Sequence, residues 1–582
     1  MSAIDSMALL MVFFTPGLLW LLFLSHWKEM RFIEIVISSF GLSLVSLPLL
    51  LAFSGYFDLV IPISAIWVFT VFCGIASLLY LLSLRRSKDQ QTLKLSRDDV
   101  YAILLLAFHI GLWYLYFLKY PVFYGSFVND PLWHVATALQ VAQSGGRSLL
   151  QSLQYPLALH YILSLVVRWT NYEPIVVCRW TVASIESLTV LLVYSVGARF
   201  FKNSRCGLFC AFAYSILIPV GIIHFDNAGT FSNILANFYT VLALFMLDFS
   251  LINSSAKTYL TQLAIGTALI FSHFSSFTLI SFLWLFAPVV YIYFRNLFKR
   301  YMLSISSLSA GLVAILLVFP NLLANISRVL YGPYSLLLPG DAFFRSLYDS
   351  VPILGILYGF AGLPNLAIIV VACALLLWRF RQELWYPFVS GYFIYSCVLS
   401  LQGGNVWRFG LYALFVAVLS EGYLIWNLQK LIFWKVSRLS SHALTNTINS
   451  RGLLIIVLLA LATTGPFFRF ANNLPGDSAP ERQIAIYQSM KWIGSNTSRD
   501  SCFLSVGLLE YLYLPVVANR TFQGDYEIPP EEIYSLSKQD RIDYVAVSTR
   551  DERLEAFKSN ELFELMFENE YVLIFHIKRV AD

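Results

Sequence analysis

The sequence predicts a polytopic α-helical membrane protein with about fourteen spans that ends in a small soluble α/β domain. Hydrophobic residues make up 58 % of the 582 residues and charged residues only 13 %. A soluble domain has roughly 45–50 % apolar and about 25 % charged residues. Charge is also unevenly spread, because residues 1–470 carry net +12 and residues 471–582 carry net −7. These observations exclude an ordinary soluble enzyme and a disordered chain, and they divide the protein into a basic membrane body and an acidic tail.

Apolar runs recur along the body, and each approaches the roughly 20 residues that a helix needs to cross a membrane. The fourteen predicted spans cover residues 7–25, 33–54, 61–84, 100–118, 175–198, 206–224, 231–250, 259–276, 277–294, 302–321, 353–378, 384–401, 409–428 and 452–470. Every second connection is rich in Lys and Arg, holding 20 of the 28 basic residues of the body. Because basic residues favour cytoplasmic loops, we expect a multi-pass protein of the cell membrane with the N-terminus and the tail outside the cytoplasm.

Two of the predicted outside loops, residues 119–174 and 322–350, are too long to be simple turns. Within the first, residues 131–143 predict an amphipathic helix, with Asp130 as its N-cap and a closing Gly145-Gly146 pair. Residues 156–167 are apolar but too short to span, and we expect them to lie in the interface or to re-enter the membrane.

The tail, residues 471–582, alternates predicted helices and strands, which indicates a small α/β domain outside the cytoplasm. The predicted helices cover residues 479–495, 529–537 and 551–559, and the predicted strands cover 501–507, 542–548 and 571–577. The tail has no cluster of His, Asp or Cys, so we expect it to bind substrate or to act as a scaffold.

Carboxylates are scarce in the outside loops of the body, so each can be weighed singly. Asp130 lies in FVNDPLWH, and His134 follows one helical turn later. Asp130 can be a helix cap, a positioned base, or both. Asp226 lies in IHFDNAGTFSN, where it is either a turn residue or a functional carboxylate.

Histidines gather at the same predicted level, and two arginines lie near it. His134, His160, His224 and His273 are four of the eight histidines in the chain, and together they favour a polar cavity or a metal site. Arg179 begins a span and Arg408 lies in QGGNVWRFG. Each is either a snorkelling boundary residue or a ligand for a lipid phosphate.

The order of these segments resembles the GT-C class of membrane glycosyltransferases. The resemblance rests on the loop-one segment FVNDPLWHVATALQVAQSGG, on QYPLALHYILSLVVRW, and on CRWTVASIESLTVLLVYSVGARFF. The tail segments IYQSMKWIGSNTSRDSCFLSV, IDYVAVST and YVLIFHI are similar to tails of uncharacterised prokaryotic, especially archaeal, members. The class includes protein mannosyltransferases, aminoarabinose transferases of lipid A and oligosaccharyltransferase catalytic subunits.

The resemblance implies an inverting hexosyl- or pentosyltransferase that takes its sugar from a polyprenyl-phosphate donor at the outer membrane face. By position, Asp130 matches the loop-one acid, Asp226 the second acid and Arg408 the arginine that contacts the donor phosphate. Asn129 stands where many members have a second acid, and the Trp-Trp-Asp-Tyr-Gly signature of oligosaccharyltransferases is missing. The resemblance therefore disfavours en-bloc transfer of an oligosaccharide and leaves metal dependence open.

Several candidate partners and functions follow. We assign Asp130 and Asp226 to catalysis, and a divalent metal ion, if one binds, to Asp130, His134, His224 and Asp226. We assign substrate binding to His134, His160, Arg179, His224, His273 and Arg408. The partners are the lipid-phosphate-linked sugar, membrane lipids and a glycan, lipid or protein acceptor, but not nucleic acid. The alternatives are a lipid-linked glycan transporter or polymerase, and a non-enzymatic membrane scaffold.

Overall fold

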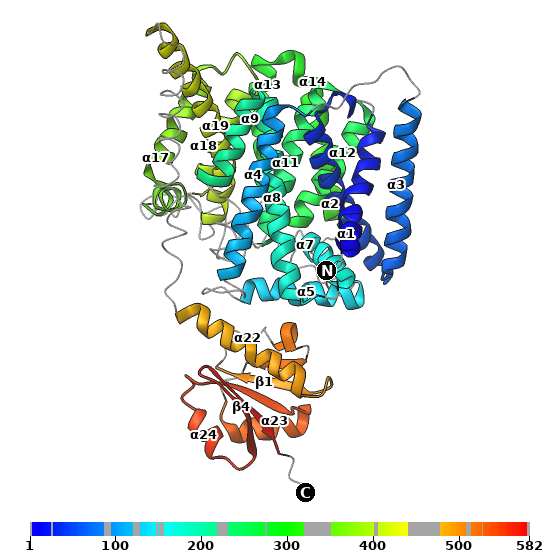
Figure 1. Ribbon diagram of the computed structural model, residues 1–582, viewed down its shortest axis with the longest axis vertical. Helices are drawn as coiled ribbons and strands as arrows, with labels where there is room; N and C mark the ends of the chain where they lie inside the picture. Colours follow the sequence, from blue (N-terminus) through cyan, green and yellow to red (C-terminus); the bar gives the residue numbers. More distant parts are fainter. Residues whose placement is uncertain are drawn as a thin grey trace.

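The computed structural model is a bundle of membrane-length helices with a small domain attached at one end (Figure 1). It describes residues 3–24, 27–85, 95–119, 129–146, 149, 156–170, 172–217, 231–273, 276–318, 351–400, 406–439, 478–507, 514–518, 520–525 and 528–578. The body contains α1 Ala3–Phe23, α2 Phe32–Tyr56, α3 Ile63–Arg85, α4 Arg97–Lys119, α5 Asn129–Ser144, α7 Ala158–Thr170, α8 Pro174–Phe200, α9 Ser204–Phe212, α11 Phe231–Ile252, α12 Ala256–Ser272, α13 Phe277–Tyr293, α14 Arg295–Val318, α17 Val351–Trp378, α18 Trp385–Ser400 and α19 Val406–Leu439. Short single turns cover Trp27–Glu29 and Ala213–Leu217.

Twelve of the fourteen predicted spans coincide with helices of the body. Of the predicted span 206–224, α9 and the turn after it cover residues 206–217, and residues 218–224 and 452–470 lie outside the described residues. Within the described ranges, six helices are long and apolar enough to cross a membrane by length and composition. They are Phe32–Tyr56, Ile63–Ser83, Arg97–Leu118, Pro174–Phe200, Phe231–Ile252 and Arg295–Val318. Several others, among them Phe277–Tyr293, are apolar but shorter. The polytopic helical class is therefore confirmed.

Some helix ends differ from the sequence prediction. Helix α14 begins at Arg295, well before the predicted residue 302, because basic residues are good helix formers as well as boundary markers. Helix α19 continues to Leu439 instead of stopping near residue 428, and its 34 residues span about 51 Å at the usual helical rise. This length exceeds the roughly 30 Å of a bilayer core, so a loop predicted after residue 428 is in part a helical extension.

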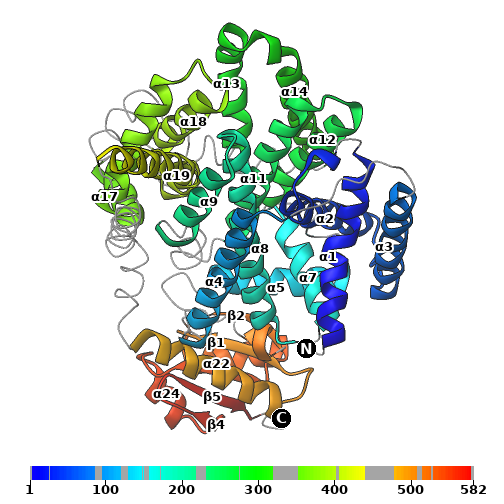
Figure 2. The same ribbon diagram turned by 45° about the horizontal axis from the view of Figure 1, so that its top comes forward.

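The bundle has a centre and two flanks. Figure 2 shows α1, α2 and α3 on one side and α17, α18 and α19 on the other, with α8 and α11 between them. Helix α11 is almost completely buried by the surrounding helices. Helices α12 and α14 approach very closely, since a Cβ added at Gly266 would lie 2.0 Å from the Leu308 carbonyl oxygen and one at Gly311 would lie 2.1 Å from that of Leu263. Small residues at such crossings let membrane helices pack backbone to backbone.

We call the end of the bundle next to the tail, where α5 and α7 lie, the tail-side end, and the opposite end the far end. At the far end, Arg199 at the end of α8 pairs with Glu34 of α2 at 3.0 Å and with Asp248 of α11 at 3.2 Å. Arg31 binds the same Glu34 at 2.9 Å and lies 3.7 Å from Asp99 of α4. These contacts bring the predicted cytoplasmic ends of four helices to one level.

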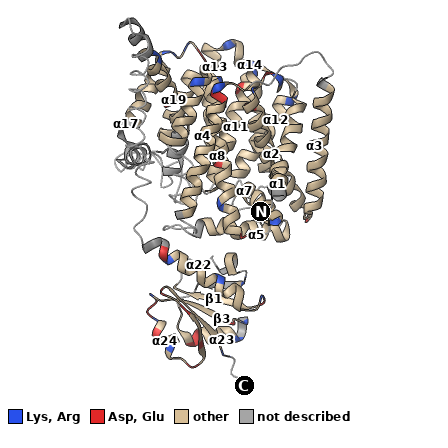
Figure 3. Cartoon of the chain, in the orientation of Figure 1, with Lys and Arg blue, Asp and Glu red and all other residues tan. Residues whose placement is uncertain are grey.

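The basic residues of the whole bundle gather mostly at the same far end. Figure 3 shows Lys and Arg gathered mostly at the far end of the helices. The N-terminus lies near the tail-side end, on the same side of the bundle as the tail (Figure 1). The predicted alternation of the helices is therefore consistent with the structure, while the assignment of one side to the cytoplasm stays a prediction from the basic residues.

The tail is a five-stranded sheet with helices packed against it. Its elements are α22 Ser478–Asn496, β1 Cys502–Val506, the single turn Leu514–Ala518, β2 Thr521–Asp525, α23 Pro530–Asp540, β3 Tyr544–Ser548, α24 Leu554–Ser559, β4 Phe563–Glu568 and β5 Val572–Ile577. The strand order is β2-β1-β3-β5-β4. Strands β2, β1 and β3 are parallel, and β5 is antiparallel to both β3 and β4. The predicted α/β tail is confirmed.

The sequence prediction found the three central strands and missed the two edge strands. Strands β1, β3 and β5 are almost wholly buried, so their apolar runs stand out in the sequence. Strand β4 is mostly exposed, and β2 has the sequence TFQGD. An edge strand has one partner and needs little apolar surface, which removes the signal that identifies a buried strand.

Candidate functional site

The predicted loop-one helix exists, but it begins earlier than expected. Helix α5 starts at Asn129, so Asp130 lies inside the first turn and Pro131 follows it, whereas the sequence placed Asp130 before the helix as its cap. Proline is tolerated throughout this turn because the first amides of a helix have no intrahelical acceptor. The helix ends as predicted, since Gly145 and Gly146 have φ values of 69° and 80°. Such backbone favours glycine.

Two of the predicted histidines meet at the tail-side end. His134 of α5 and His160 of α7 are both fully buried. The His134 Nδ1 atom lies 2.9 Å from His160 Nε2, and the two rings stack with centroids 5.0 Å apart. One ring must donate its N–H and the other accept, so the tautomer of one histidine fixes that of its partner. Asp130 lies four residues before His134, one turn away on the same side of the helix.

Aromatic rings enclose the histidine pair. Trp133 meets both imidazoles edge-on, with centroids 5.2 and 5.3 Å away, and Phe231 at the start of α11 lies 5.9 Å from His134. This surround removes water from the pair. Burial first, and then the neighbouring His134, hold the pKa of His160 well below its ordinary value. His160 is therefore neutral at physiological pH.

Helix α7 is short, as predicted, but it is covered by protein. Its 13 residues cover only about 20 Å, and residues Ala158 to Val166 are all buried. It packs against α5, α2 and α8. The expected interfacial or re-entrant segment is therefore a helix buried inside the tail-side end. It carries His160, one member of the histidine pair.

The remaining predicted binding residues lie on neighbouring helices. Arg179 of α8 is buried, and its guanidinium carbon lies 4.2 Å from the centre of the Phe117 ring of α4. His273 is buried at the end of α12, a helix that also contacts α7. Arg408 was expected in a short loop, but α19 begins at Val406, so Arg408 lies in its first turn. The amides of a helix start favour an anion, which suits a phosphate ligand.

Part of the predicted site lies outside the described residues. His224 and Asp226 belong to this part, and so do the side chains of Asp130 and Arg408, because the first residues of α5 and α19 are described only as backbone. Among the described residues there is no group of three or more His, Cys, Asp or Glu that could hold a metal ion. Because His134 uses Nδ1 to bind His160, it can offer only Nε2 to a metal, in the arrangement that metal-binding histidines usually adopt. The metal stays a prediction.

A second buried polar cluster lies deeper in the bundle. Glu186 of α8 accepts a hydrogen bond from Trp113 Nε1 at 2.8 Å, and the same carboxylate oxygen binds His109 Nε2. His109 and Trp113 are one turn apart on α4, and His109 and Glu186 are fully buried. Glu186 is therefore hydrogen-bonded within the interface between α8 and α4. His109 could have been found as an ionisable residue within a predicted span.

Comparison with solved structures places this geometry in a known fold. The archaeal oligosaccharyltransferase AglB from Archaeoglobus fulgidus, in complex with an inhibitory peptide and a dolichol-phosphate, matches with a TM-score of 0.52 and 12 % identity over 78 % of this chain and 69 % of that chain. ArnT from Cupriavidus metallidurans bound to undecaprenyl phosphate matches with a TM-score of 0.53 and 12 % identity over 82 % of this chain and 98 % of that chain. Apo ArnT gives 0.54 and 13 %, over 83 % and 98 %.

At these identities the likeness shows the fold alone. No protein-family model matches the sequence. No curated protein matches it either. The chain has the GT-C fold of polytopic membrane glycosyltransferases, as the sequence resemblance implied.

Proposed function

We propose that this protein is an inverting glycosyltransferase that moves a hexosyl or pentosyl group from a polyprenyl-phosphate donor to a lipid, glycan or protein acceptor. The observation that carries the proposal is the buried His134–His160 pair, set in a GT-C fold one turn from Asp130. The solved structures that share this fold support the choice of donor, because one contains dolichol-phosphate and another undecaprenyl phosphate. The reaction takes place at the tail-side end.

The chemistry needs few groups, because the donor already carries a phosphate as its leaving group. Asp130 acts as the general base and removes the proton from the acceptor hydroxyl. The acceptor oxygen then forms a bond to the anomeric carbon as the bond from that carbon to the phosphate oxygen breaks. This single displacement inverts the anomeric centre and releases polyprenyl phosphate.

Cations and neutral histidines divide the remaining tasks. Arg179 and Arg408 stabilise the negative charge that develops on the leaving phosphate. Neutral His160 cannot compete with them for the phosphate as a cation, so it and its partner His134 orient substrate hydroxyls and support the first turn of α5. Asp226, His224 and His273 complete the proposed set. A divalent metal ion, if one binds, would be held by Asp130, His134, His224 and Asp226 and would supply further positive charge.

Replacing Asp130 by Asn tests the proposal. Loss of the base should lower the rate of transfer by about 10²- to 10⁴-fold, the range that general-base catalysis contributes, while folding is retained. Release of polyprenyl phosphate from a panel of radiolabelled polyprenyl-phosphate hexoses and pentoses, incubated with membranes containing the protein, measures the rate.

The matched control is Asp98→Asn. Asp98 also lies in the first turn of a helix, α4, but at the far end, where its carboxylate accepts a hydrogen bond from Ser204 Oγ at 2.5 Å. This variant should transfer at the normal rate. Full activity of Asp130→Asn, with wild-type release of product, would remove Asp130 from catalysis and end the assignment.

A further inference from the structure

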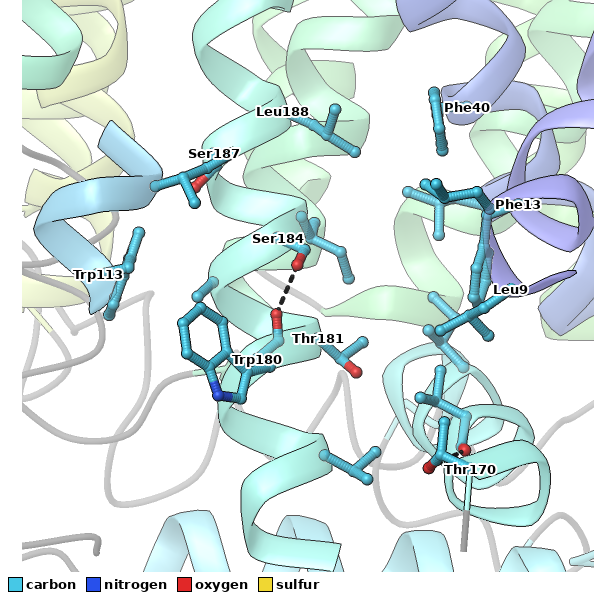
Figure 4. A pocket seen from close by; sticks show the side chains of 18 of the residues that line it. Leu9, Phe13, Phe40, Trp113, Thr170, Trp180, Thr181, Ser184, Ser187 and Leu188 are labelled. Carbon is cyan, nitrogen blue, oxygen red and sulfur yellow. Dashed lines mark hydrogen bonds between the residues drawn. The ribbon is translucent and has the colours of Figure 1, made fainter. Parts of the chain in front are cut away.

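A long apolar groove lies on the side of the bundle, separate from the histidine pair. Its volume is about 740 Å³, and its lining comes from α1, α2, α4, α7 and α8. Figure 4 shows its walls: Trp113 and Trp180 stand on one side and Phe13 and Phe40 on the other, with Ser184 of α8 on the floor between them. A floor of short side chains between aromatic walls leaves room for a slender hydrocarbon chain.

The groove is about as deep as one leaflet. The α8 residues that line it run from Val176 to Leu188, a helical distance of about 18 Å. Half of the roughly 30 Å hydrocarbon core of a bilayer is about 15 Å. Because α8 begins at Pro174 at the tail-side end and continues to Phe200 at the far end, the groove enters from the tail-side surface and stops near the middle of the bundle.

The groove is continuous with the surface that faces lipid. Three residues of its rim are strongly exposed: Leu10 at 58 %, Tyr114 at 53 % and Ile110 at 44 %. Beyond the rim, the exposed face of α4 is also apolar, with Leu115 and Leu118 each 62 % exposed. An apolar hollow that opens onto such a belt is filled from the bilayer and not from water.

The mouth of the groove leads to the candidate site. Thr170 at the end of α7 and exposed Tyr172 line it at the tail-side end. The two helices that form this end also carry site residues: α7 carries His160 beside the lining residue Ile162, and α8 carries Arg179 next to Trp180. A lipid whose chain fills the groove would therefore place its polar head at the level of these residues.

We propose that this groove binds one acyl chain of a bilayer lipid from the leaflet on the side of the tail. The depth of the groove matches the chain of a lipid that occupies one leaflet. A polyprenyl carrier chain is several times longer than one leaflet and would run past the inner end of the groove, at the level of Leu188. The bound lipid packs against Trp113 and Trp180 and keeps its head at the mouth, beside Thr170 and Tyr172.

Filling the groove tests the proposal without turnover. Ser184 is exposed, and its Oγ donates to the Trp180 carbonyl oxygen at 2.7 Å. Ser184→Phe therefore adds a ring to the groove floor at a position that packing does not fix. The control is Ser307→Phe on α14, where Ser307 Oγ makes the same bond to the Leu303 carbonyl at 2.8 Å and lines no part of this groove.

The probe is phosphatidylcholine with a diazirine on one acyl chain, mixed into phosphatidylcholine nanodiscs that hold the full-length protein. We expect cross-links on the α8 segment 176–188 in the wild type and in Ser307→Phe, and about tenfold fewer in Ser184→Phe, which corresponds to about 1.4 kcal/mol of binding free energy. If Ser184→Phe does not fold, as judged by its thermal unfolding, Thr181→Phe on the same floor replaces it.

Two results would overturn the proposal. Equal labelling of segment 176–188 in the groove-filling variant and in the control would mean that the labelling comes from bulk lipid against α8. Displacement of the label by polyprenyl phosphate as effectively as by unlabelled phosphatidylcholine would assign the groove to a carrier chain. Both readouts are independent of the Asp130→Asn experiment, because cross-linking requires no sugar transfer.

Discussion

The two ends of the helix bundle use buried charge in opposite ways. At the far end, Arg31, Glu34, Arg199 and Asp248 pair with one another across three helices, and Trp385 donates to Asp248 at 2.8 Å. At the tail-side end, His160 bonds to His134 in a buried pair, and burial keeps His160 itself uncharged. Buried charges that pair with one another fix the packing of helices, whereas an uncharged His160 leaves the neighbouring space able to accept a charged substrate. The first end holds the bundle together, and the second is where we place the chemistry.

The largest expected effect on stability comes from breaking the far-end network. The side chains of Glu34 and Asp248 are only 2 % and 9 % exposed. Arg199→Met would therefore leave both carboxylates buried and would remove the arginine partner of Asp248. Removing one partner of a buried ion pair costs about 3–5 kcal/mol. We expect a large fall in the thermal unfolding midpoint of the detergent-solubilised protein.

The far end also provides the control for that prediction. Lys202 pairs with Glu383 at 2.7 Å, but its side chain is 70 % exposed. An exposed pair of this kind contributes about 0–1 kcal/mol. Lys202→Met should therefore leave the unfolding midpoint nearly unchanged, and a similar fall in both variants would show that loss of positive charge, rather than burial, is responsible.

Acidification should weaken the tail-side end through His160. The folded protein holds the pKa of His160 below its ordinary value, whereas in the unfolded chain it is about 6.5. Below that pH the unfolded state binds a proton that the folded state does not, so the free energy of unfolding falls as the pH decreases, by up to about 1.4 kcal/mol per pH unit for this one group. Above pH 6.5 the contribution of His160 is constant.

Thermal unfolding between pH 8 and pH 5 measures this slope, and His160→Gln isolates it. The variant cannot take up the proton, so its stability should fall less steeply below pH 6.5 than that of the wild type. Parallel curves for the two proteins would mean that His160 is protonated as easily when folded as when unfolded.

A smaller effect is expected where the tail meets the body. Tyr487 of α22 donates to the Glu173 carboxylate at 2.5 Å, and Lys491 lies 3.3 Å from it. Burial and the bond to Glu173 raise the pKa of Tyr487 to about 12. Glu173→Gln should reduce the stabilisation that this contact gives α22 by about 1 kcal/mol. Amide hydrogen exchange in α22 should then rise by about fivefold.

The matched variant for this contact is Glu481→Gln on the same helix. Glu481 is exposed in the first turn of α22, so its change removes an equal charge without touching the body. Exchange in α22 should then stay at the wild-type rate. Equal increases in the exchange rate in both variants would mean that the stability of α22 depends on its own charge and not on its attachment to the body.

Most of the helix assignments followed from local patterns in the sequence. Apolar length identified the spans, and the glycines at 145 and 146 identified the end of α5 because only the local backbone is involved. The edge strands β2 and β4 were missed, since an edge requires no apolar face. The extension of α19 to Leu439 was also missed, because amphipathic helix beyond a span lacks the continuous apolar run used to define one.

The candidate site was predicted only in part. Helical spacing in the sequence predicted that Asp130 and His134 lie one turn apart, and the predicted spans put His160 at the same level of the membrane. It could not show that His134 and His160 bind each other, because they are 26 positions apart on separate helices. It likewise gave no partner for Glu186, which finds His109 and Trp113 more than 70 positions away.

The sequence by itself determined that this chain is a membrane protein with an acidic soluble tail, because composition and apolar length depend on no other residue. It also determined which few polar groups are available at each end. The tertiary structure decided which of them are paired: Arg199 meets Glu34 across 165 positions, and the groove along α8 is formed by five helices. Such pairings depend on how helices far apart in the sequence pack together, and local sequence patterns do not predict that packing.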